Sequence, residues 1–256
     1  MTKQRINHNL LIFPPMVIAV AACRCAAAEL RPLSTDRPDT TESPYTVDAG
    51  HYQFEMELAA WNRHHEISLG ELNAKVGLDA ATDLQVILPF YRHVSSGGEG
   101  FGDVEIRLKH NFWGNDDGPT ALALMPFIKL PTANGDLGND EIEGGLIVPY
   151  GFEGLAGWSC AVMGEVDLAA DDDGGGYQPI LLTSATASHE LTETIGIFLE
   201  VVSVLSAESG KDREAYFNTG MTCAVTATSQ IDGGVRIGLT ESSADFTPFL
   251  GVSAKF

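Results

Sequence analysis

The sequence predicts an all-β protein: a closed, antiparallel, up-and-down transmembrane β-barrel of about 12 strands. Three observations support this prediction. Beyond residue 50, apolar and polar residues alternate with period two almost to the last residue, which is the pattern of strands and not of helices. The alternating segments have about 9–12 residues, close to the length of a membrane-crossing strand and longer than a typical soluble strand. The chain also begins with the features of an export signal.

The composition excludes other classes of protein. The 256 residues include 35 Asp and Glu against 15 Lys and Arg, a formal net charge of -20. We therefore expect no nucleic-acid partner, because binding to phosphates requires a basic surface. The chain has no run of roughly 18 apolar residues, which excludes an ordinary transmembrane helix.

Residues 1–28 are expected to be a signal peptide. Lys3 and Arg5 precede an apolar stretch at 10–22, and the small residues at 26–28 form a cleavage site. A lipoprotein signal with Cys23 as the modified residue is an alternative. The boundaries that we expect are a signal peptide at 1–28, an extended periplasmic or lumenal leader at 29–50 and the barrel at 51–256. The leader is assigned because it contains three prolines and has no hydrophobic period.

The first strand is predicted at 52–61, where Tyr52 and Phe54 alternate with Gln53 and Glu55. The clearest pattern lies at 103–112, where Asp103, Glu105, Arg107, Lys109 and Asn111 share one face. The phase of one segment, 180–188, is ambiguous. The other predicted strands are centred on alternating apolar residues at 72–78, 84–90, 122–130, 146–150, 158–168, 197–201, 217–225, 235–239 and 250–256.

The connections alternate in length. The gaps after the even-numbered strands are mostly short, whereas several gaps after odd-numbered strands are longer and polar: 92–101, 131–143, 169–177 and 206–214. Two odd-numbered gaps, 62–66 and 240–244, depart from this pattern because they are short. Outer-membrane barrels have short periplasmic turns and longer outer loops, so both ends of the chain are expected in the periplasm.

The strands must close into a ring, because an unpaired sheet edge is too costly in hydrocarbon. The apolar face then contacts outer-membrane lipid, and the polar face lines the lumen. A soluble exported β-sandwich would bury the apolar face instead and is the least favoured alternative. The residues expected to line the lumen are Glu55, Glu57, Lys75, Asp103, Glu105, Arg107, Lys109, Glu165, Asp167, Glu200, Asp232 and Arg236.

The last strand ends the chain on Phe256, after apolar residues at alternate positions. This ending resembles the signal that the outer-membrane assembly machinery of Gram-negative bacteria recognises. We expect loss of Phe256 to lower the amount of folded protein in the outer membrane.

Several blocks resemble one family. Residues 33–44 read LSTDRPDTTESP and are followed by GHYQFE at 50–55, an opening similar to that of an outer-membrane transporter family named for the meta pathway of phenol degradation. Its leader motif is carried by Thr35, Asp36, Arg37 and Pro38. The shorter blocks at 101–104 and 129–132 resemble later parts of the same family. The resemblance covers essentially the whole mature chain and implies a barrel for the uptake of small, often aromatic, compounds.

The function expected is that of a porin-like channel or transporter for small, aromatic or hydrophobic solutes in the cell outer membrane. A lumen with more acids than bases should favour cations or neutral solutes over anions. The alternative is a non-conducting structural or adhesive barrel whose lumen is closed by side chains and by the leader. Arg37 is expected to fold against lumen acids such as Glu55 or Glu57.

No enzyme activity is expected, because the chain has no Gly-x-Ser-x-Gly motif and no supported base–orienter pair. No cofactor or metal is expected either. The adjacent His64 and His65 would point to opposite faces of a strand, and they fall at a predicted loop tip.

Overall fold

The computed structural model describes residues 30–62, 66–95, 98–138, 140–171, 176–207 and 212–256. The predicted signal peptide and the two adjacent histidines lie outside the described residues. Residues 31–256 form one unit, and the fold below is that of this unit alone.

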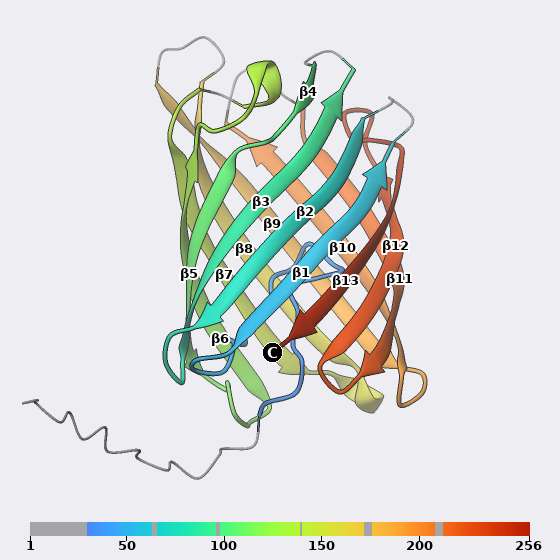
Figure 1. The fold of residues 1–256 in the computed structure, drawn as a ribbon. Coiled ribbons are helices and arrows are strands. Elements are labelled where there is room, and N and C mark those ends of the chain that lie inside the picture. The colour runs from blue at the N-terminus through green and yellow to red at the C-terminus, as the bar shows by residue number, and fades with distance from the viewer. Residues whose placement is uncertain (1–29, 63–65, 96–97, 139, 172–175, 208–211) are drawn as a thin grey trace, which may run out of the picture. The chain divides into compact units, whose positions relative to one another are not determined.

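Twelve long strands form a closed antiparallel ring (Figure 1). Alternating side chains with no helical period explain why each segment adopts a strand. A short extra strand, β4 (Gly98–Gly100), pairs with β3 inside the long polar connection predicted at 92–101. The ring consists of β1 (Tyr52–Trp61), β2 (Ile67–Gly77), β3 (Thr82–Val94), β5 (Val104–Trp113), β6 (Thr120–Leu130), β7 (Glu143–Glu153), β8 (Ser159–Ala170), β9 (Tyr177–Glu190), β10 (Ile195–Ser206), β11 (Glu214–Thr226), β12 (Ser229–Gly238) and β13 (Phe246–Lys255).

The ring closes between β1 and β13, the first and last strands. Gln53 pairs with Lys255 and Met56 with Val252. Just beyond β13, Phe256 exchanges two backbone hydrogen bonds with Tyr52, at 3.1 and 2.8 Å. Its side chain is exposed and meets the Phe54 ring edge-on, with 5.9 Å between the ring centroids. The closed ring confirms the predicted barrel and excludes the β-sandwich.

The outer face of the ring is apolar. Large hydrophobic side chains from every part of the ring are exposed there, including Phe54, Leu58, Leu108, Phe112, Leu146, Val162, Leu181, Leu199, Met221 and Leu250. Exposure of such a surface to water would be unfavourable, whereas it matches the hydrocarbon interior of a membrane. The described residues include no helix long and apolar enough to cross a membrane.

The two ends of the barrel differ. The short turns at 78–81, 114–119, 191–194 and 227–228 lie at the end where the chain enters β1 and leaves β13 (Figure 1). The connection between β6 and β7 at the opposite end is long and contains a short 3₁₀ turn, Gly135–Leu137. By the usual asymmetry of outer-membrane barrels, the short-turn end faces the periplasm.

The leader, residues 31–50, lies inside the barrel (Figure 1, blue). It has no helix or strand of its own, and it runs up the lumen from the short-turn end and back down to β1. Its two arms touch each other: the hydroxyl oxygens of Ser34 and Ser43 are 2.8 Å apart, and the Ser43 amide donates to Asp36 at 2.9 Å. Residues 31–50 therefore pack within the ring of strands.

Candidate functional site in the barrel lumen

One side of the lumen carries most of its charge. We call the inward face of β1, β2, β3, β5, β10 and β12 the charged wall. Period-two alternation sends every second residue of these strands inward, where the leader covers them. Most are fully buried although they are ionisable, so each needs a partner of opposite charge or a set of hydrogen bonds. The wall consists of Glu55, Glu57, Lys75, Asp83, Arg107, Lys109, Glu200, Asp232 and Arg236.

Asp36 is the most strongly held leader residue. Lys109 Nζ lies 2.6 Å from Asp36 Oδ1, and Lys75 forms an ion pair with the other oxygen and with Glu55. The Asp36 amide also donates to Glu55 at 2.9 Å. Burial by itself would raise the pKa of Asp36, but the two lysines outweigh it and hold the pKa well below the usual 3.8. The leader thus supplies the negative charge that allows two lysines to be buried.

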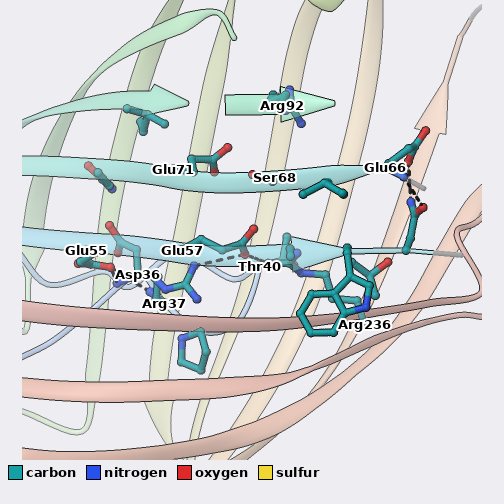
Figure 2. Close-up of a pocket in the computed structure, with 18 of the residues that line it drawn as sticks. Asp36, Arg37, Thr40, Glu55, Glu57, Glu66, Ser68, Glu71, Arg92 and Arg236 are labelled. Carbon is teal, nitrogen blue, oxygen red and sulfur yellow. Dashed lines mark hydrogen bonds and ion pairs between the residues drawn. The ribbon is translucent and has the colours of Figure 1, made fainter. Parts of the chain in front are cut away.

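Arg37 is held by three acids of the wall. Its amide donates to Glu55 at 3.1 Å, and its guanidinium donates to Asp232 at 2.8 Å and to Glu57 at 3.4 Å. Figure 2 shows Glu55 and Glu57 beside Arg37. The guanidinium also lies 5.8 Å from the centre of the Phe249 ring. The expected contact of Arg37 with lumen acids is therefore present, and it includes an acid, Asp232, that the sequence reasoning did not connect with it.

Glu200 receives the next turn of the leader. It accepts hydrogen bonds from the amides of Thr40 at 2.9 Å and Thr41 at 2.7 Å, and from the Thr41 hydroxyl at 2.6 Å. Asn218 donates to the same carboxylate at 2.7 Å. A buried carboxylate without a cation is thus satisfied by donors alone.

Part of the opposite side of the lumen is apolar. Met125, Ile147 and Met163 are almost fully buried and form a cluster against which Phe127 and Leu182 pack. We call this cluster on β6, β7 and β8 the apolar wall; the same inward face also carries Lys129, Glu143, Glu165 and Asp167. Glu42 of the leader contacts both walls. Its amide lies 3.2 Å from Met163 Sδ, and its carboxylate forms an ion pair with Arg107.

A second group of contacts holds the leader where it enters and leaves the lumen. Asp48 lies 2.9 Å from Arg31 Nε and 3.1 Å from Lys255 Nζ. Asn115 accepts a hydrogen bond from the Thr46 amide at 2.9 Å. Burial would raise the pKa of Asp48, but hydrogen bonds from Arg31 and Lys255 outweigh it and lower the pKa. Both arms of the leader are therefore fixed at the periplasmic end.

The leader separates two cavities. The larger, about 660 Å³, lies at the long-loop end and is lined by leader residues 36–40 and Glu42 together with β1, β2 and β3 (Figure 2). The smaller, about 250 Å³, lies at the short-turn end beside residues 31–34, 45–47 and 114–118. The lumen is thus hollow above and below the leader.

The remaining predicted residues lie in different surroundings. Asp103 precedes β5, and its carboxylate accepts the amides of Thr132 and Ala133, both at 2.9 Å, so it fastens a loop at the rim. Glu105 pairs with Arg107, and Arg236 donates to Glu57 at 2.7 Å. Glu165 and Asp167 are partly buried on β8. In the leader motif, the Thr35 hydroxyl donates to the Arg37 carbonyl at 2.6 Å, and Pro38 lines the larger cavity.

Sequence reasoning missed the apolar wall and the inward rings of Phe198 and Phe249. One available signal was the small and apolar set Ala121, Ala123 and Met125, which lies on the face opposite the leucines of the same strand. Another was the inward glycines Gly220 and Gly234. A Cβ there would come within 2.8 Å of the rings of Phe198 and Phe249 respectively, so the glycines make room for the rings.

Comparisons with known proteins agree with this architecture. The family described as "Putative MetA-pathway of phenol degradation" matches residues 35–256. An outer membrane channel from Pseudomonas putida F1 has a TM-score of 0.63 at 16% identity, covering 87% of this chain and 100% of that one. The NanC porin has a TM-score of 0.58 at 9% identity, covering 80% of this chain and 100% of that one. No curated protein matches the chain significantly. The fold is thus that of an outer-membrane β-barrel.

Proposed function

The chain belongs to the family named for the MetA pathway of phenol degradation, and on this premise we propose that its barrel is an outer-membrane channel for small solutes. The single observation that carries the proposal is the arrangement of the lumen. Two cavities, of about 660 and 250 Å³, lie on either side of a leader with no regular secondary structure. A barrel with a purely structural role would not need a hollow interior on both sides of a polar obstruction.

The contacts of the leader suit a removable obstruction. They consist of ion pairs, hydrogen bonds and apolar packing, and the leader adds no strand to the ring. Water in an emptied lumen could solvate the charged wall once the leader has left. Passage therefore requires displacement of leader residues 36–40 and Glu42, which line the larger cavity.

The two walls define the class of solute. The acids Glu55, Glu57, Glu200 and Asp232 disfavour anions, whereas the apolar wall accepts a hydrophobic surface. We therefore propose small neutral or cationic solutes, including aromatic ones. The description of the family, which refers to phenol degradation, supports aromatic compounds without specifying one.

The test compares the intact protein with a variant that lacks residues 32–47, both in planar bilayers. We expect low conductance for the intact barrel and a several-fold higher, cation-selective conductance without the leader. Liposomes carrying the variant should admit benzylammonium faster than benzoate. Reversal potentials that show equal permeability to potassium and chloride would contradict the selectivity.

One observation favours a second candidate, a non-conducting barrel. The leader contacts both walls and is also fixed at its entrance, so it could close the lumen permanently. The same experiment separates the two candidates. If the intact barrel stays silent under all voltages and added solutes, while only the shortened variant conducts, the leader is a permanent seal and the channel proposal is wrong.

A further inference from the structure

The Arg37 side chain lies in a socket that the pairing of three neighbouring strands creates in the barrel wall. In the strand registers, Gly251 of β13 pairs with Glu57 of β1 on one side and with Asp232 of β12 on the other. Three neighbouring strands thus present carboxylate, glycine and carboxylate in one row on the inward face. The Arg37 guanidinium lies on the glycine, between the two acids.

Shape and charge of the socket both match a planar cation. A Cβ at position 251 would lie only 2.6 Å from Arg37 Cζ, so the absence of a side chain creates the space. The Phe249 ring contacts two guanidinium groups: its centre lies 4.6 Å from Arg236 Cζ and 5.8 Å from Arg37 Cζ. Guanidinium combines stacking on aromatic rings with paired hydrogen bonds to carboxylates, which an ammonium cannot do.

Arg37 does not use the whole socket. Among the described residues, neither Asp232 Oδ2 nor Arg37 Nε has a hydrogen-bond partner, although Asp232 is only 3% exposed. The guanidinium reaches only one oxygen of Asp232, Oδ1, at 2.8 Å. A free guanidinium could rotate and engage both oxygens, which is the stronger geometry.

Without Arg37 the socket would carry one net negative charge. Glu57 keeps its ion pair with Arg236, at 2.7 Å, whereas Asp232 loses its cation. A buried carboxylate without a partner is costly, so the vacated socket should take up a monovalent cation. Arg37, Glu57 and Arg236 also line the larger cavity, which gives a solute room beyond its charged group.

We propose that Glu57, Asp232, Phe249 and Gly251 form a binding site for solutes that carry a guanidinium group, and that Arg37 of the leader occupies it as an internal competitor. A guanidinium solute entering from the long-loop end would displace Arg37 and so help to release the leader. This proposal rests on the proposed channel only for the route of the solute, because the socket itself is part of the barrel wall.

The test uses the full-length protein in detergent, with guanidinium chloride and methylammonium chloride as probes at matched ionic strength. By calorimetry, we expect the Arg37→Ala variant to bind guanidinium about tenfold more tightly than methylammonium. The intact protein should bind guanidinium much more weakly, because Arg37 fills the socket. Equal affinities of Arg37→Ala for the two probes would overturn the proposal.

A glycine substitution tests the location of the site without changing any charge. Gly251→Ala, added to Arg37→Ala, should abolish the preference for guanidinium by filling the socket. The matched control is Gly164→Ala on β8, where a Cβ would meet nothing within 4 Å, and it should leave the preference intact. Persistence of the preference in the Gly251 variant would overturn the proposal. Because binding is measured in detergent, its failure is separate from any failure of conduction.

Discussion

The charged wall and the apolar wall contact the same leader in different ways. On the charged wall, each leader residue meets a specific partner: Asp36 meets Lys75 and Lys109, and Thr41 meets Glu200. On the apolar wall, Met125, Ile147 and Met163 offer a surface without directional groups, apart from the sulfur that Glu42 approaches. The charged wall can therefore fix the position of the leader along the barrel axis, whereas the apolar wall mainly fills space.

The difference has an energetic consequence. Removing one member of a buried ion pair leaves the other uncompensated, at a cost of about 3–5 kcal/mol. A conservative change in an apolar contact of similar volume usually costs less than about 1.5 kcal/mol. Substitutions on the two walls should therefore affect docking of the leader to very different degrees.

The largest effect is expected from Asp36→Asn. This change leaves Lys75 and Lys109 buried without their shared counter-charge, so docking of the leader should weaken by about 3–5 kcal/mol. Hydrogen–deuterium exchange of leader amides should then accelerate roughly a hundredfold or more, while exchange in the strands stays unchanged. The control is Asp79→Asn, in the exposed turn between β2 and β3. Similar exchange in both variants would show that the charged wall does not position the leader.

Lowering the pH should also weaken docking of the leader, but by less than Asp36→Asn does. The pKa of Asp36 is lowered in the docked state, so docking is favoured above the ordinary value of 3.8 and weakens progressively as the pH falls below it. Leader exchange, corrected for the intrinsic pH dependence of amide exchange, should rise between pH 4 and pH 3. Asp36→Asn should lose most of this dependence. A pH response of equal size in that variant would assign it to other acids.

The smallest effect is expected on the apolar wall, from Met163→Leu. The substitution keeps the volume of the side chain and removes the sulfur near the Glu42 amide. Because such exchanges cost less than about 1.5 kcal/mol, leader exchange should rise by less than about tenfold. An effect as large as that of Asp36→Asn would break the distinction between the two walls.

Much of the barrel could be predicted from the sequence, because the residue pattern that specifies each strand lies within that strand. The alternation at 52–61 and 103–112 arises because one face of each strand contacts lipid and the other faces the lumen. No distant residue is needed to recognise it. The ring of twelve and the short-turn end are likewise confirmed. The exception is β4, whose Gly-Glu-Gly sequence carries no alternation and which forms only because β3 offers it an edge.

The docking of the leader could be anticipated only in part. Arg37 was expected against Glu55 or Glu57, since lumen acids were the available partners. Its contact with Asp232 joins residues 195 positions apart, and its direction depends on the closed ring. The pairing of Asp36 with Lys75 and Lys109 was missed for the same reason. In the leader itself, prolines and small polar residues have no period that indicates which side chains point to which wall.

The socket of Arg37 is divided between the two ends of the chain. Glu57 belongs to the first strand of the ring, whereas Asp232 and Gly251 belong to the last two. It therefore does not exist in a nascent barrel whose seam between β1 and β13 is still open. A chain whose last strand has not yet paired with its first has no complete site for Arg37, so occupation of the socket by Arg37 requires a closed barrel.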